Sequence, residues 1–154
     1  MWFEDIALNV KETLGAYAFT EDNIIAFAKL YDPQLFHIDR KAAEKSIYGG
    51  IIASGWHTAS VWMGLMIAHR RARVAAGAEQ TQDNYVSPGV RDIRWHRPVY
   101  AGTTLTFTTE AVAKLDWPSR PQFGLVEGRN EARDADGVLY YSFTNRVLVA
   151  KRAP

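Results

Sequence analysis

The feature that most constrains the fold is a long apolar segment in the middle of the chain. From Gly55 to Val74 the sequence is apolar on nearly every face of a helix until His69, and its last turn is basic. A helix that is apolar on all sides is buried, and basic residues suit a helix C-terminus. The pattern therefore predicts a central helix that other elements must wrap.

Four large side chains of this segment are spaced as one packed surface: Trp56, Trp62, Met63 and Met66. We interpret them as core residues of the central helix. The alternative is that these four side chains line a binding site for an acyl chain.

The segments before the central helix also favour helices. Thr20 is an N-cap candidate followed by acidic residues, and the apolar positions that follow fit a helix that ends before Pro33. A second short helix is predicted over Arg40 to Lys45.

The second half of the chain changes to the two-residue alternation of strands, with a hairpin signal at Asp136-Gly137. We predict an α+β fold of one domain, residues 1–154, in which an antiparallel sheet wraps the central helix. The predicted strands cover residues 91–99, 103–113, 123–133 and 137–149.

Composition narrows the function classes. The chain has 154 residues, a net charge of +1 and no cysteine, which argues against general nucleic-acid binding, disulfide scaffolds and thiolate chemistry. Its first residues are acidic where a signal peptide needs basic ones, and its longest apolar run is too short for a membrane span. We therefore expect a cytoplasmic protein with no membrane or nucleic-acid partner.

The clearest candidate for chemistry is the pair Asp32 and His37, five residues apart in a segment predicted to be a tight, partly buried loop. A carboxylate and an imidazole that face one cavity can hold a water, one taking a proton and the other returning one. The alternative is structural, because an Asp after a helix is often a cap and a loop His is often only hydrogen-bonded.

Three stretches of the sequence, 27–39, 48–58 and 88–103, resemble the MaoC-like dehydratases, a family that includes the (R)-specific enoyl-CoA hydratases. The similarity extends from Phe3 to about Val149. It implies a hot-dog fold that joins two sheets edge to edge in a homodimer or higher oligomer. It also implies a trans-2-enoyl thioester of coenzyme A or acyl carrier protein as substrate.

The resemblance implies a role for each matching residue. Asp32 and His37 match the pair that activates water, and Gly55 matches the backbone N–H donor to the thioester oxygen. The family pattern needs no metal and no cofactor apart from the coenzyme A of the substrate. The residues expected to line the substrate site are Tyr31, Phe36, Ser54, Trp56 and His57.

Two positions depart from the family pattern. Gln34 stands where many hydratases have asparagine, and Met63 stands where some members have a serine that hydrogen-bonds near the catalytic pair. For His57 a capped or surface-facing side chain is the alternative to a substrate role.

Two other functions compete with a hydratase. A hot-dog thioesterase usually has a carboxylate on or near the central helix, and the segment from Gly55 to His69 has no Asp or Glu. A non-catalytic acyl-thioester binder, or one subunit of a hetero-oligomer, is compatible with Met63. The four histidines lack the spacing of a zinc site, and no nucleotide-binding fingerprint is present.

Overall fold

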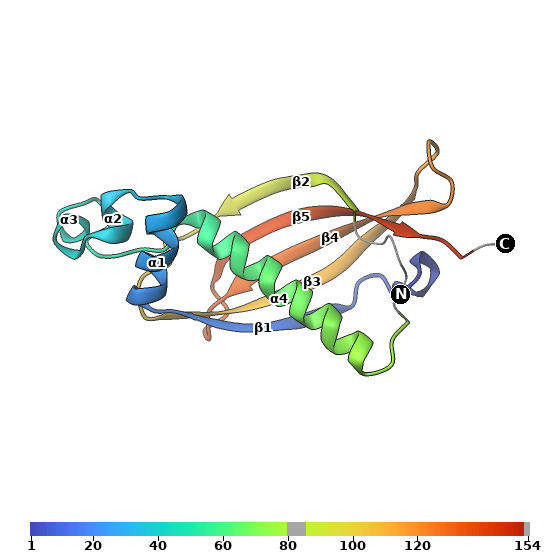
Figure 1. The fold of residues 1–154 in the computed structure, drawn as a ribbon, viewed down its shortest axis with the longest axis horizontal. Helices are drawn as coiled ribbons and strands as arrows, with labels where there is room; N and C mark the ends of the chain where they lie inside the picture. The colour runs from blue at the N-terminus through green and yellow to red at the C-terminus, as the bar shows by residue number, and fades with distance from the viewer. Residues whose placement is uncertain (80–85, 153–154) are drawn as a thin grey trace.

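The computed structural model describes residues 1–79 and 86–152 and contains a five-stranded antiparallel sheet (Figure 1). Its strand order is β1-β3-β4-β5-β2, so β1 and β2 form the two edges. The hairpin turn at Gly137 connects β4 to β5, as predicted. The strands are β1 (Lys11–Phe19), β2 (Val86–Trp95), β3 (Thr103–Asp116), β4 (Phe123–Arg133) and β5 (Leu139–Ala150).

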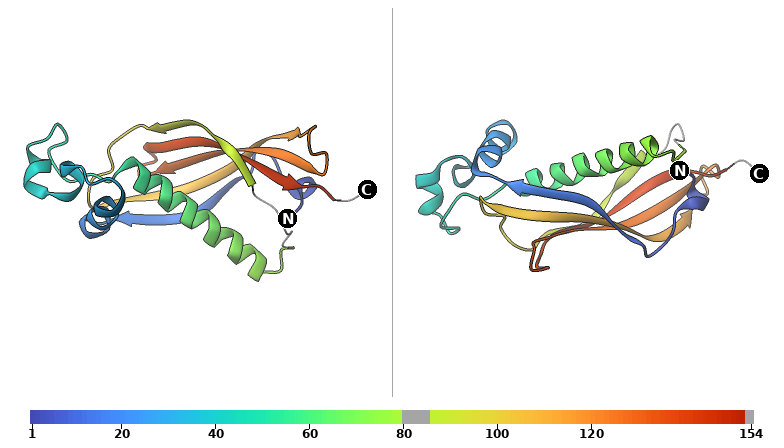
Figure 2. Two further views of the ribbon diagram at one scale, coloured as in Figure 1. Left: turned by 45° about the horizontal axis from the view of Figure 1, so that its top comes forward. Right: turned by 90° about the horizontal axis from the view of Figure 1, so that it is seen from below.

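The α-helices occupy two places relative to the sheet. The long helix α4 crosses one face of it, whereas the three short helices gather at the end where α4 begins (Figures 1 and 2). Both chain termini lie toward the opposite end (Figure 1). The helices are the 3-10 turn η1 (Phe3–Asp5), α1 (Glu21–Tyr31), α2 (Leu35–Ile38), α3 (Arg40–Glu44) and α4 (Gly55–Ala75).

The main core forms between one face of α4 and the sheet. Trp62 of α4 meets Phe143 of β5 edge to face, with ring centroids 4.7 Å apart. Met66 lies one turn further along the same face and is also buried. The core prediction is confirmed for these two helix residues.

The other half of the core prediction is wrong. Trp56 is 58% exposed and Met63 53% exposed, because the sheet of this chain covers only one face of α4. Met63 therefore lies on the uncovered face.

Three further differences from the sequence prediction concern the elements themselves. The edge strand β1 was not predicted, and the first strand of the second half lies at Val86–Trp95 instead of 91–99. The segment between α1 and α3 contains the one-turn helix α2, where a loop was expected.

In the described part of the chain, no helix is both long and apolar enough to span a membrane.

Candidate active site

Asp32 lies directly after α1, where its N–H still donates to the carbonyl of Ala28 at 2.8 Å. Pro33 disfavours helical backbone at the preceding residue, so the helix ends here as predicted. The carboxylate accepts from Gln34 Nε2 at 2.8 Å and from Ser54 Oγ at 2.7 Å. Partial burial raises the pKa of Asp32, but the hydrogen bonds from Ser54 and Gln34, together with the effect of His37, outweigh it, so the pKa lies below its ordinary value.

His37 projects from α2 and is buried. Its Nδ1 lies 2.7 Å from the carbonyl oxygen of Ile52. A carbonyl only accepts, so Nδ1 carries the proton and donates it, and Nε2 of the neutral ring is an acceptor. Phe36 packs edge to face on the imidazole, with ring centroids 4.5 Å apart. The tautomer and the orientation of the ring are therefore both fixed.

The two candidate catalytic side chains meet at Asp32 Oδ2 and His37 Nε2, which lie 3.4 Å apart. With neutral His37, both atoms are acceptors and cannot bond each other, but they can share a donor such as water. Across the described residues, no group of three or more His, Asp or Glu side chains is placed to hold a metal ion. The arrangement is suited to polarising a water and moving its protons.

The segment that supports both side chains is held by the strand-like stretch before β3. Ala53 N–H donates to the Val99 carbonyl at 2.8 Å, and Ala101 N–H donates to the Ile51 carbonyl at 3.1 Å. These bonds fix Ile52, which anchors His37, and the following Ser54, which contacts Asp32.

Gly55, the residue predicted to be the N–H donor, lies at the N-terminus of α4. Ser54 is its N-cap and accepts from Trp56 N–H at 3.2 Å. Gly55 is the first helical residue, and N–H groups at this position have no partner inside a helix. The carbonyl of Gly55 accepts from Trp95 Nε1 at 2.9 Å.

Trp95 is a neighbour of Gly55 that the sequence did not reveal. A Cβ on Gly55 would lie 2.5 Å from Cε2 of the Trp95 indole, so only glycine fits beneath this ring. The glycine at a helix start was a signal of close approach, but the sequence did not show which side chain approaches it.

The residues expected to line the substrate site are not all in one place. Tyr31 is 71% exposed at the end of α1, and Trp56 lies on the uncovered face of α4, edge to face with Trp95 at 5.4 Å. Ser54 is fully buried with its hydroxyl on Asp32. Phe36 lies against His37. Among these expected residues, Phe36 contacts His37 through its ring and Ser54 contacts Asp32 through its hydroxyl.

His57 is enclosed in an aromatic cage, so the surface-facing alternative is wrong. Its ring stacks on Phe27 with centroids 4.6 Å apart and an interplanar angle of 6°, and meets Phe19 and Tyr17 edge to face. The side chain is 4% exposed, and its Nδ1 is buried without a hydrogen-bond partner among the described residues. Burial lowers the pKa of His57 to about 4, so the ring is neutral at neutral pH.

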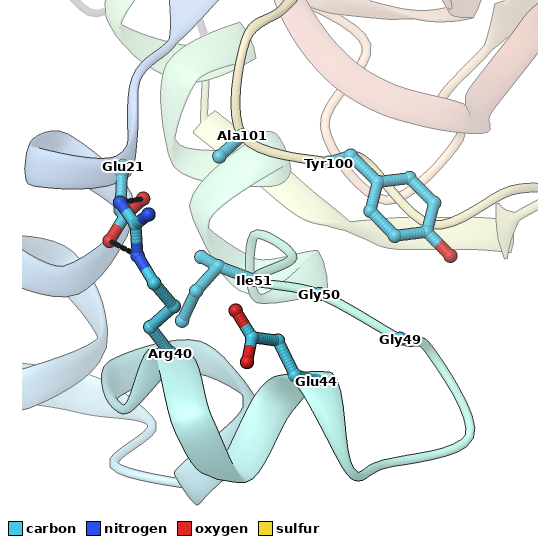
Figure 3. A pocket seen from close by; sticks show the side chains of 8 residues that line it. All are labelled: Glu21, Arg40, Glu44, Gly49, Gly50, Ile51, Tyr100 and Ala101. Carbon is cyan, nitrogen blue, oxygen red and sulfur yellow. Dashed lines mark hydrogen bonds and ion pairs between the residues drawn. The ribbon is translucent and has the colours of Figure 1, made fainter.

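A separate shallow hollow of about 240 Å³ lies between the starts of α1 and α3 and the turn before β3 (Figure 3). Arg40 bonds both carboxylate oxygens of Glu21 there, at 3.2 and 2.6 Å. The hollow is not lined by Asp32, His37 or Gly55, so it is distinct from the candidate catalytic site.

Comparison with known proteins agrees with this architecture. The chain matches the family model described as a MaoC like domain over residues 7–131. A MaoC-like dehydratase from Rhodospirillum rubrum is 28% identical, with a TM-score of 0.83 and coverage of 100% of this chain and 99% of that one.

More distant similarities are also present. An (R)-hydratase from A. caviae has a TM-score of 0.69 at 20% identity, over 94% of this chain and 97% of that one, which shows a common fold. A mesaconyl-CoA hydratase of Haloarcula marismortui is 36% identical over 67 residues, which are 43% of this chain and only 19% of that protein. The likenesses to the solved structures confirm the predicted hot-dog fold.

Proposed function

The chain belongs to the MaoC-like domain family, and from this premise we propose that it is a hydro-lyase acting on enoyl thioesters. It adds water to a trans-2-enoyl thioester to give an (R)-3-hydroxyacyl thioester, or catalyses the reverse. The observation that carries this proposal is the pair of acceptors, Asp32 Oδ2 and His37 Nε2, 3.4 Å apart.

In the proposed reaction the oxygen of water bonds to C3 of the substrate while the pair takes one of its protons. A proton from the pair is delivered to C2, so the elements of one water are added and the pair returns to its starting state. Negative charge develops on the thioester oxygen, where the Gly55 N–H and the positive end of the α4 dipole stabilise it. Coenzyme A enters only as part of the substrate, and no other cofactor is needed.

The proposed substrate is an acyl thioester of coenzyme A or carrier protein. The A. caviae (R)-hydratase and the Haloarcula mesaconyl-CoA hydratase support this class. The latter similarity also brings branched dicarboxylic thioesters into consideration.

We also propose that the active form is a homodimer in the cytoplasm. Nearly every residue of β2 is exposed along a free sheet edge, and unpaired edges are normally covered. The uncovered face of α4 with Trp56 and Met63 is apolar and continues toward Trp95 at the end of β2. A second copy of the chain is the partner that the family resemblance favours.

The first test is the absorbance of the conjugated enoyl thioester with a panel of trans-2-enoyl-CoA chains, including a branched dicarboxylic one. The parent protein should remove the absorbance of at least one substrate, and Asp32→Asn should be slower by about 100-fold or more. Chiral chromatography of the product should give the (R) isomer. No loss of absorbance with any chain would contradict the proposal, and binding without turnover would then favour the acyl-thioester binder. Release of free thiol would indicate a thioesterase.

A further inference from the structure

Ser54 joins the two halves of the candidate site. We propose that it is a positioning residue that fixes the orientation and the proton-accepting state of the Asp32 carboxylate. This inference rests on the proposed hydratase function. The Oγ of Ser54 lies 2.7 Å from Asp32 Oδ2 and 3.2 Å from Trp56 N, and Ser54 is completely buried.

The direction of these two hydrogen bonds follows from the chemistry of the groups. The Trp56 N–H only donates, so the Ser54 oxygen must accept from it. The hydroxyl has a single proton, which is then directed to Asp32 Oδ2. Asp32 must accept at this oxygen, and its ionised form does so best. The helix cap therefore favours the carboxylate over the carboxylic acid.

The carboxylate is also fixed in its plane. Gln34 donates to Oδ1 and Ser54 to Oδ2, so each oxygen has a donor of its own. Gln34 is exposed and Ser54 is not, so the bond from Ser54 is the better protected from water. His37 also lowers the pKa of Asp32 when its ring is protonated, and among the described residues it is the one titratable group identified as acting on this carboxylate.

Ser54 also determines where the proposed N–H donor lies relative to the Asp32 carboxylate. Ser54 precedes Gly55, whose N–H is the proposed donor to the thioester oxygen, and it contacts the Asp32 carboxylate that faces the water. Removing its hydroxyl leaves the helix start and the carboxylate without their common anchor. A loss of position of about 1 Å at a reacting group can lower a rate about 100-fold.

A plain N-cap role for Ser54 is the competing explanation. Glycine is itself an acceptable N-cap and costs only a few tenths of a kcal/mol, so Ser54→Gly removes the contact with Asp32 at little cost to the helix. Ser54→Ala removes the same contact with a larger loss of capping. Ser60→Ala is the matched control, because its hydroxyl is exposed and donates to the Trp56 carbonyl within α4, at 2.8 Å.

The decisive readout is the titration of the Asp32 carboxyl, followed by carbon-13 NMR in aspartate-labelled protein and assigned with Asp32→Asn. In Ser54→Gly and Ser54→Ala the midpoint should rise above that of the parent, whereas Ser60→Ala should leave it unchanged. With an active substrate, kcat should fall about 10- to 100-fold with KM changed less than about 3-fold, and the acid limb of kcat/KM should move to higher pH.

Each outcome separates the two proposals. An unchanged Asp32 midpoint in a folded Ser54→Gly protein would overturn the positioning role, whether or not the parent is active. A parent that hydrates no thioester, combined with a raised midpoint, would refute the hydratase and still support the control of Asp32 by Ser54. Melting temperatures of all variants show whether each is folded, and Ser54→Gly remains decisive if Ser54→Ala does not fold.

Discussion

The Nδ1–H of His37 donates to the carbonyl of Ile52 at 2.7 Å, and this bond determines what the rest of the ring can do. It holds the neutral tautomer whose Nε2 is an acceptor, and it turns that atom toward Asp32. Ile52 belongs to the segment that also carries Ser54, so one short stretch of backbone supports both members of the pair.

Two substitutions of His37 separate the anchor from the reacting nitrogen. In His37→Asn the side-chain amide can still donate to the Ile52 carbonyl from the place of Nδ1, but nothing replaces Nε2. We expect a folded protein with kcat lowered about 100- to 10,000-fold. In His37→Gln the amide can reach toward the position of Nε2, but the bond to Ile52 is lost. We expect this variant to be inactive and also less stable. Unfolding in urea and single-substrate kinetics measure the two effects, and full activity in His37→Asn would contradict the role of Nε2.

Gly55→Ala should disrupt the start of α4. The new Cβ would lie 2.5 Å from the Trp95 indole, whose Nε1 bonds the Gly55 carbonyl, so the ring or the helix must move. Overpacking of this kind costs about 1–3 kcal/mol of stability. We also expect a fall in kcat, because the donor N–H moves with the helix.

The matched control is Gly50→Ala, where the added Cβ would come no closer than 3.9 Å to Tyr100. It should change stability and kcat little. Urea unfolding and kinetics on both variants test the prediction, which fails if Gly55→Ala behaves like Gly50→Ala.

The sequence predicted the elements whose signals are local. Thr20 caps α1 as expected, through a bond from Asn23 N–H, and Pro33 stops it. The strand β4 has the predicted bounds of 123–133. The apolar segment and its basic last turn placed the ends of α4 within one residue, at Gly55 and Ala75.

The missed strand has a physical explanation. In β1 the register shifts between Thr13 and Gly15, so the buried residues change from even positions, with Leu14, to odd positions, with Phe19. This bulge hides the two-residue alternation that identifies a strand. The cage of His57 could not be predicted either, because two of its aromatic rings come from this strand.

The contact between Ser54 and Asp32 was beyond the sequence for another reason. The two residues are 22 positions apart and meet only because the short helices bring the end of α1 to the start of α4. The sequence placed both residues in the site but could not pair them. It also suggested no partner for Gly55, whereas the structure supplies Trp95.

Met63→Lys should weaken self-association. Met63 is exposed on the apolar face of α4, and a charge there would have to be buried in the proposed dimer without a partner. We expect the monomer fraction to rise in sedimentation equilibrium, and activity to fall with it if the site needs both copies. Ile47→Lys is the control, since Ile47 is 94% exposed but follows α3 in the sequence and is not part of α4 or β2. Equal effects of the two substitutions would contradict a specific interface on α4.

The free energy of unfolding should decrease as the pH falls from about 6.5, the ordinary pKa of a histidine, toward 4. The expected cause is protonation of His57. The unfolded chain binds a proton at His57 near pH 6.5, whereas the folded chain does so only near 4. Between these values the unfolded state holds more protons, so the free energy of unfolding falls with falling pH. The full difference is on the order of 3 kcal/mol.

The carboxyl groups with lowered pKa values act at lower pH. Asp32 and Glu131 start from ordinary values of 3.8 and 4.5, and their stabilisation begins to be lost only within about one pH unit of these values. The contribution of His57 therefore dominates in the interval between about 5.5 and 6.5.

His57→Phe is the test, because phenylalanine can stack on Phe27 and has no nitrogen to bury without a partner. Its free energy of unfolding should stay nearly constant between about pH 5.5 and 6.5, where that of the parent falls, and at about pH 7 it should equal or exceed the parent value. Urea unfolding at a series of pH values measures both curves. A parent curve that is flat in this interval, or a slope that persists in His57→Phe, would show that His57 is not the group responsible.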